Sequence, residues 1–242
     1  LKQLAKQGKL AETMAQRASR LSERKGEGKS RPLIDSADDM LLERVLRPKA
    51  RAKFGGRVKA LVSGGAPLTP EIGYFFTGLG MPLLQGYGQT EAGPIISVNR
   101  PSTMKLHTVG PPMKDVQVKI ADDGEILVKG DLVMQGYWRN EDATRKTIRD
   151  GWVYTGDIGI IDADGHLQIT DRKKDIIVNS GGDNVSPQRV EGNLTIEPEI
   201  AQAMVYGDRH PHLVGLLVVD AEWLAEWAEK AGKPAAPSDL AD

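Results

Sequence analysis

Two short apolar segments with a helix-like segment between them are the feature that most constrains the fold of this chain. Residues 58–62 and 81–84 are short, mostly apolar runs, which are typical of buried strands. Between them, Thr69 precedes a proline and a glutamate, the residue types favoured at the start of a helix. This helix is expected to end at Gly78 or Gly80. Two strands joined by a helix predict a parallel α/β unit.

Each of these two predicted strands is followed by a glycine-rich segment. The first segment is residues 63–67 (SGGAP), and the second is residues 85–91 (QGYGQTE). Because the carboxyl ends of parallel strands meet at the same edge of a sheet, we expect the two segments to lie side by side. Ligands of α/β proteins commonly bind at this edge.

The second segment contains residue types suited to a nucleotide site. Gly86 and Gly88 flank Tyr87, so the backbone is predicted to turn sharply and a flat group to approach the ring. Thr90 offers a hydroxyl to a phosphate oxygen, and Glu91 offers a hard oxygen ligand to Mg²⁺. The alternative interpretation is a tight turn around a tyrosine packed in the core.

The rest of the chain predicts two further regions. Two hairpins, at residues 116–128 and 158–170, each turn at an Asp-Gly pair, and a short helix at 141–148 lies between them. Beyond the charged run at 171–175, the order strand, helix, strand, strand, helix predicts a small α+β domain. The fold class is therefore α/β plus α+β. The predicted divisions are a partial α/β portion at 1–108, a β-barrel-like subdomain at 109–171, a hinge at 172–175 and an incomplete carboxyl-terminal domain at 176–242.

The amino-terminal region is predicted to be helical and is basic. Helices are expected over residues 1–25 and from Asp38 or Asp39 to Pro48, with a polar loop between them. Residues 1–59 hold 16 Lys and Arg against 7 Asp and Glu, whereas the remaining residues hold 16 against 26. A solvated helical face and an arm that contacts anionic lipid are both open interpretations.

Composition excludes several classes of site. The chain has no cysteine, so disulfides, thiolate zinc sites and cysteine nucleophiles are ruled out. No apolar run approaches the roughly 18 residues of a membrane span. We expect a cytoplasmic protein, with a peripheral contact at the inner membrane surface as a further option, and no nucleic-acid partner.

Six sequence blocks resemble those of the adenylate-forming (AMP-binding) enzymes, most closely the bacterial long-chain fatty acyl-CoA synthetases. The blocks, in the family's order, are LVSGGAPL (61–68), QGYGQTE (85–91), GEI to GYW (124–138), DGWVYTGDIG (150–159), DRKKD (171–175) and GGDNVSP (181–187). The chain resembles a carboxyl-terminal fragment of such an enzyme. The resemblance implies that a fatty acid and Mg·ATP give an acyl-adenylate, from which CoA displaces AMP.

The resemblance also implies roles for particular residues. Thr90 would hold the α-phosphate, Glu91 would bind Mg²⁺, and Lys174 would be the hinge between the two half-reactions. The residues implied in binding ATP, AMP or CoA are Gly64, Gly65, Ala66, Gln85, Gly86, Tyr87, Gly88, Thr90, Asp157, Arg172, Gly181 and Gly182.

Within that set, three assignments are more specific. Tyr87 would stack on adenine. Asp157 would accept hydrogen bonds from both ribose hydroxyls, and Arg172 would complete the ribose clamp. The alternatives are a turn aspartate and a surface arginine. Gly181 and Gly182 would approach the pantetheine of CoA, because only small residues let a backbone come so close.

The sequence departs from the family pattern in two ways. The phosphate loop rich in Ser, Thr and Gly is absent, and so is the catalytic lysine, since Lys230 and Lys233 lie in a different context. We therefore expect the 242 residues alone to be inactive as a ligase. The alternatives are an acyl-adenylate or aryl-CoA ligase of the same superfamily, and a non-catalytic nucleotide-binding truncation. A homodimer also stays open.

Overall fold

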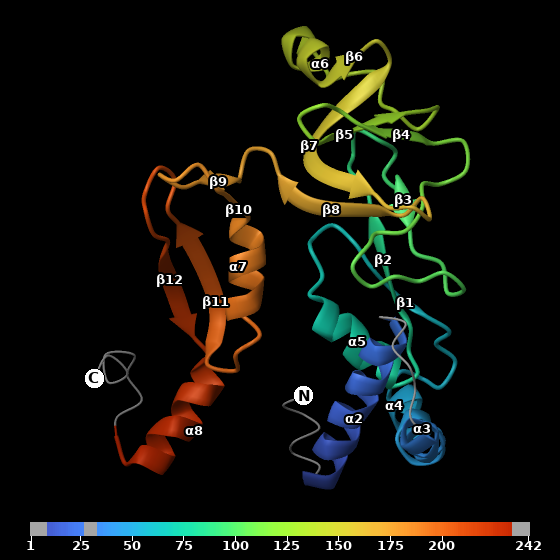
Figure 1. Ribbon diagram of the computed structural model, residues 1–242, viewed down its shortest axis with the longest axis vertical. Coiled ribbons are helices and arrows are strands. Elements are labelled where there is room, and N and C mark those ends of the chain that lie inside the picture. Colours follow the sequence, from blue (N-terminus) through green and yellow to red (C-terminus); the bar gives the residue numbers. More distant parts are fainter. Residues whose placement is uncertain (1–8, 27–32, 234–242) are drawn as a thin grey trace. The chain divides into compact units, whose positions relative to one another are not determined.

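The computed structural model describes residues 9–26 and 33–233 (Figure 1). The chain divides into two compact units. The first comprises Leu1–Thr155 and Gly159–Ile169, and the second comprises Gly156–Ile158 and Thr170–Asp242. The predicted helix over residues 1–8, most of the predicted polar loop and the tail after residue 233 lie outside the described residues.

Helices form most of the first part of unit one that the structure describes. They are α2 (Lys9–Gly26), α3 (Leu33–Val45), α4 (Arg47–Lys53) and α5 (Pro70–Gly78). The prediction was wrong about the second helix, since α3 begins before Asp38 and ends before Pro48. Pro48 lies instead in the first turn of α4, where its missing N–H has no helical partner to lose.

The helices of unit one enclose a small apolar core. Its buried members are Ala15, Ala18, Leu42, Leu46, Leu79 and Met81. Helices α2 and α5 lie side by side (Figure 1). A Cβ added at Gly78 would lie 2.4 Å from the carbonyl oxygen of Ala18, so a glycine is needed where these helices meet. Met14 and Leu21 of α2 pack against this core and are partly buried.

The predicted parallel α/β unit is confirmed. Strand β1 (Leu61–Ser63) pairs in parallel with β2 (Leu83–Tyr87), and β2 also pairs antiparallel with β3 (Ser97–Val98). The prediction ended the second strand too early, at Leu84. Gly86 and Tyr87 belong to β2 because they pair with Val98 and Ser97 of β3. This long-range pairing overrides the local turn signal of glycine.

The predicted β-rich region is confirmed as a five-stranded sheet. Its strands are β4 (Gln117–Ile120), β5 (Glu125–Lys129), β6 (Ile148–Arg149), β7 (Trp152–Ile161) and β8 (Leu167–Arg172), and α6 (Glu141–Thr147) precedes β6. The order is β4-β5-β7-β6, with β8 paired to β7. The core beneath it consists of Tyr87, Ala92, Ile96, Val109, Ile126, Val128 and Leu167.

Up to residue 233, unit two contains two small antiparallel sheets and two helices. Its elements are β9 (Ile177–Val178), β10 (Asn184–Val185), α7 (Pro187–Leu194), β11 (Ile200–Tyr206), β12 (Val214–Val219) and α8 (Ala221–Ala231). Helix α7 packs on β11. Ser186 and Asp220 are the N-cap residues of α7 and α8, because Ser186 accepts a hydrogen bond from the Arg189 N–H and Asp220 accepts one from the Trp223 N–H. Strand β10 was not predicted.

Helix α5 has the predicted N-cap residue without the expected bond. Thr69 occupies the N-cap position, but its side chain makes no capping hydrogen bond. Among the helices of residues 9–26 and 33–233, none is long and apolar enough to cross a membrane.

Candidate functional site

The two glycine-rich segments lie next to each other at the carboxyl edge of the parallel strands, as predicted. Ser63 is paired with Gln85. One residue further on, a Cβ added at Gly64 would lie 3.2 Å from the Gly86 carbonyl oxygen. Gly65 has a φ of +82°, a left-handed conformation that glycine adopts without strain. Gly64, Gly65 and Ala66 are exposed and free to line a ligand site.

Tyr87 is buried, with 8% of its surface exposed. It belongs to the apolar core beneath the five-stranded sheet, together with Ala92 and Ile96. This agrees with the interpretation of a packed tyrosine. Stacking on adenine stays a prediction, in which a ligand would reach only a small part of the ring.

The glycines that flank Tyr87 do not make the sharp turn that was predicted. Neither has a left-handed backbone, and Gly86 lies within β2. At Gly88, an added Cβ would lie 1.6 Å from the Pro94 carbonyl oxygen. Gly88 is therefore required because another part of the backbone passes where a side chain would begin.

Glu91 is held by a hydrogen bond that the sequence did not predict. The Tyr137 hydroxyl donates to Glu91 Oε1 over 2.8 Å. This bond to the carboxylate, together with partial burial, raises the pKa of Tyr137 above its ordinary value. Thr90 is exposed beside Glu91.

The donor chemistry of Glu91 fits Mg²⁺ if a nucleotide supplies further ligands. Mg²⁺ is usually bound through one or two carboxylates plus substrate phosphates. No group of three or more His, Cys, Asp or Glu side chains within residues 9–26 and 33–233 could hold a metal ion without such help. Glu91 would then supply the protein's carboxylate and the nucleotide its phosphate oxygens.

The loop that carries Tyr137 is attached to the backbone around Glu91. The Met134 N–H donates to the Glu91 carbonyl over 2.9 Å, and Val133 forms a β-bridge with Ala92. In the sequence, Tyr137 stands out only as part of the block at residues 124–138. The local signal in the sequence was the pair Gly136-Tyr137. That pair does not indicate that the Tyr137 hydroxyl contacts Glu91, which lies 46 positions away in the chain.

In unit two, Asp157 and Arg172 are brought together. Asp157 is 7% exposed, and Arg172 Nε lies 3.2 Å from its Oδ1. The Lys173 N–H donates to the Gly156 carbonyl over 2.8 Å, which joins the same two segments. Because most of the Arg172 side chain is exposed, the ion pair itself contributes little to stability. The guanidinium stays accessible to a ligand, and its ribose role stays a prediction.

Lys174 and the Gly181–Gly182 turn are exposed. Lys174 lies in the segment that connects β8 to β9, where the hinge was predicted. Movement about this hinge stays a prediction. Asn179 shapes the glycine turn, because its Oδ1 accepts hydrogen bonds from the N–H groups of Gly181 (2.9 Å) and Asp183 (2.8 Å). The role of this asparagine was not predicted from the sequence.

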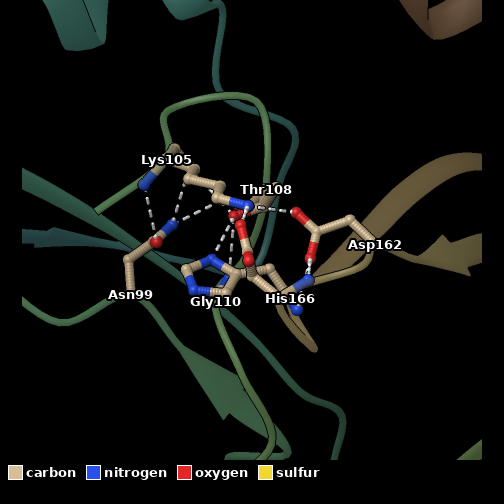
Figure 2. A network of polar contacts seen from close by, with 7 residues as sticks. Asn99, Lys105, Thr108, Gly110, Asp162 and His166 are labelled. Atoms are coloured by element: carbon tan, nitrogen blue, oxygen red, sulfur yellow. Dashed lines mark hydrogen bonds and ion pairs between the residues drawn. The ribbon is translucent and has the colours of Figure 1, made fainter. Parts of the chain in front are cut away.

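A buried polar network supports the end of β2 (Figure 2). Asn99 is 2% exposed and donates to the carbonyls of Lys105 (3.1 Å) and Thr108 (2.5 Å). Its own backbone N–H donates to the Gln85 carbonyl over 2.9 Å. The network therefore connects the loop after β3 to the strand that carries the glycine-rich motif.

The same network extends to the β7–β8 hairpin. Lys105 Nζ lies 2.6 Å from Asp162 Oδ2 and 2.5 Å from Asp164 Oδ2. Thr108 Oγ1 lies 3.3 Å from His166 Nδ1. The hydrogen bond from Lys105, with a further one from the His166 N–H, lowers the pKa of Asp162 to about 2.

Comparison with known proteins identifies the class. The family model of the AMP-binding enzymes matches residues 32–138, a range that includes both glycine-rich segments and Tyr137. This confirms the predicted resemblance, and residues 32–138 match an AMP-binding domain.

The relatives narrow the resemblance to long-chain fatty acid–CoA ligases. Long-chain-fatty-acid–CoA ligase FadD15 of Mycobacterium tuberculosis is 43% identical over 211 residues, which cover 86% of this chain and 35% of the relative. Long-chain-fatty-acid–CoA ligase 6 of Mus musculus is 38% identical over 199 residues, 76% of this chain and 28% of the relative. The chain spans about a third of the length of these curated relatives.

Solved structures support the mixed α/β architecture. O-succinylbenzoate coenzyme A synthetase (MenE) of Bacillus subtilis, in complex with ATP and a magnesium ion, matches with a TM-score of 0.61 at 28% identity. That match covers 78% of this chain and 47% of the solved one. The amide bond synthetase McbA of Marinactinospora thermotolerans matches with a TM-score of 0.57 at 34% identity, over 71% of this chain and 40% of that chain.

Proposed function

We propose that this chain is part of an AMP-forming long-chain fatty acid–CoA ligase. A carboxylate oxygen of the fatty acid would attack the α-phosphorus of ATP, and pyrophosphate would leave. The thiol of CoA, after losing its proton, would then attack the acyl carbonyl, and AMP would leave. The observation that carries the proposal is the adjacency of the two motif segments, with Ser63 beside Gln85 and Gly64 beside Gly86. The fatty acid substrate is inferred from the named relatives.

The residues of unit one would bind the nucleotide. The exposed backbone of Gly64, Gly65 and Ala66 would line the pocket, and Thr90 would donate to the α-phosphate. Glu91 would hold Mg²⁺, which would neutralise phosphate charge.

In unit two, we propose that Asp157 accepts hydrogen bonds from the ribose hydroxyls and that Arg172 orients its carboxylate. The Gly181–Gly182 turn would approach CoA. Residues 176–242 would act as the small mobile carboxyl-terminal domain, with Lys174 in the hinge at residues 172–175. The division of the chain into two compact units supports this assignment of roles.

Calorimetric titration of the 242-residue chain with a non-hydrolysable acyl-adenylate analogue tests the proposal. Because Tyr87 is buried, Tyr87→Ala would create a cavity, so Tyr87→Leu and Tyr87→Phe are better variants. We expect Tyr87→Phe to bind like the natural chain. Tyr87→Leu should bind about fivefold more weakly, at the lower end of the roughly 1–3 kcal/mol that base stacking contributes, because a ligand reaches only a small part of this ring.

Asp157→Asn tests the ribose assignment. It keeps the side-chain volume but removes the charge, and hydrogen bonds to charged groups contribute roughly 1.5–3 kcal/mol. We expect at least about tenfold weaker binding, with exposed Asp131→Asn as the matched control. Equal affinity in Asp157→Asn, Tyr87→Leu and the natural chain would refute the proposed adenosine site. The chain alone is expected to bind the analogue without producing acyl-CoA.

An aryl-CoA ligase is the second candidate. The observation that favours it is the likeness to solved structures of an O-succinylbenzoate coenzyme A synthetase and an anthranilate CoA ligase, with TM-scores of 0.61 and 0.60. Titration with an acyl-adenylate bearing a long alkyl chain and with one bearing a benzoyl group separates the candidates. Tighter binding of the benzoyl compound would favour the second.

Peripheral membrane contact and a homodimer stay predictions, as does a cytoplasmic location. The structure favours a packing role for part of the basic segment. Arg47 contacts Asp39 (2.6 Å) and Glu43 (3.0 Å), and Arg51 contacts Glu43 (2.9 Å). These two cations therefore stabilise the junction of α3 and α4 and are less available to lipid phosphates.

A further inference from the structure

We propose that Tyr137 is a positioning residue that holds the Glu91 carboxylate ready for Mg²⁺. The inference rests on the proposed function, because it takes Glu91 as the metal ligand. Its starting point is the 2.8 Å hydrogen bond from the Tyr137 hydroxyl to Glu91 Oε1.

A single hydroxyl on one carboxylate oxygen leaves the group able to bind a metal. A carboxylate has about four lone-pair positions, of which Tyr137 uses one. The hydrogen bond also restricts a side chain that otherwise rotates about several bonds. Carboxylates that bind metals are commonly held by such outer partners, and loss of the partner typically weakens metal binding or activity by about 10–100-fold.

Tyr137 can position Glu91 because its own backbone is fixed. The Tyr137 N–H donates to Thr144 Oγ1 over 2.9 Å, and this hydroxyl donates to the Asn140 carbonyl over 2.9 Å. The preceding residue, Gly136, lies so close to Thr144 that an added Cβ would be 2.8 Å from its Cγ2. Contacts with Thr144 of α6 thus fix the backbone of Tyr137.

The loop before Tyr137 fixes the backbone of Glu91 as well. Met134 donates to the Glu91 carbonyl, and Val133 pairs with Ala92. A Cβ added at Gly93 would lie 2.7 Å from Leu132, so the two segments pack closely. Glu91 is therefore held at both its main chain and its side chain by residues of one loop.

Calorimetric titration of the 242-residue chain with ATP, once with Mg²⁺ and once with EDTA, tests this role. The quantity compared is the factor by which Mg²⁺ strengthens ATP binding. We expect Glu91→Gln to abolish this factor and Tyr137→Phe to reduce it about tenfold. Metal-free AMP binding and the melting temperature of Tyr137→Phe should stay unchanged. Tyr154→Phe is the matched control, since the Tyr154 hydroxyl makes no hydrogen bond within residues 9–26 and 33–233, and its ring stacks on Arg149.

The outcomes separate the inference from the proposed function. Suppose that Mg²⁺ strengthens ATP binding by the same factor in Tyr137→Phe as in the natural chain, but no longer does so in Glu91→Gln. This result would overturn the role of Tyr137 and leave the role of Glu91 in place. Reduced AMP binding or a lower melting temperature in Tyr137→Phe would mean a merely structural role and would also overturn it. An unchanged factor in Glu91→Gln, or no ATP binding by the natural chain, would overturn the metal assignment and the inference together.

Discussion

Alanine substitution at the two glycines that flank Tyr87 should give opposite results. At Gly88, the new methyl group would lie 1.6 Å from the Pro94 carbonyl oxygen. At Gly86, the nearest atoms would be the Ser97 carbonyl oxygen and a Val98 methyl, both at 3.4 Å. The substitution is chemically identical, and only the surrounding space differs.

The expected magnitudes follow from these distances. Non-bonded heavy atoms rest roughly 3.5 Å apart, so in Gly88→Ala the backbone must move by about 2 Å. Overpacking typically costs about 1–3 kcal/mol, and a clash with rigid backbone belongs at the upper end or above. About 3 kcal/mol would lower the melting temperature by roughly 6–12 °C in a protein of this size. Gly86→Ala should change stability by less than about 1 kcal/mol, because alanine is favoured over glycine within a strand.

Thermal and urea unfolding of the two variants and the natural chain, followed by circular dichroism, provide the measurement. The acyl-adenylate titration adds a second reading. If Gly86→Ala keeps its stability but loses affinity, then Gly86 is required for ligand access rather than for folding. Equal stability of Gly88→Ala and Gly86→Ala would refute the reasoning from close backbone approach.

Two further predictions concern packing and pH. Gly78→Ala should destabilise the chain by about 1–3 kcal/mol, because the new methyl group would clash with α2. Gly192→Ala lies in open space on α7 and should be neutral or stabilise the chain by up to about 1 kcal/mol. Urea unfolding of the two variants measures both changes in stability. The pKa of Asp162, about 2 against an ordinary 3.8, means that the Lys105 contact stabilises the chain above about pH 4 and that this stabilisation is lost as the pH falls towards 2. Lys105→Met should therefore lower the melting temperature most above pH 4. The difference in melting temperature from the natural chain should shrink towards pH 2. The control Lys59→Met should show no such dependence on pH.

The local pattern of the sequence was sufficient to predict most secondary structure. The Asp-Gly turns located both hairpins, and Thr69 with the proline after it marked the start of α5. The parallel pairing of β1 with β2 followed from the strand–helix–strand order. These features depend on neighbours in sequence, and for that reason a single sequence reveals them.

Features that depend on distant contacts were predicted poorly. The strand ending at Tyr87 was called too short because its last residues pair with β3, ten residues further on. α4 was missed because Pro48 signals a helix end as readily as a helix start. The network around Asn99 also joins segments whose polar residues carry no distinctive local pattern.

The sequence by itself determined the class of chemistry, because its motifs specify which functional groups are present and in what order. The tertiary structure decided what those groups contact. It places Tyr87 in the core, makes Gly88 a point of close backbone approach, and brings Tyr137 to Glu91 across 46 residues. The physical reason is that side-chain contacts depend on how separate segments pack, whereas motif identity depends only on the order of residues along the chain.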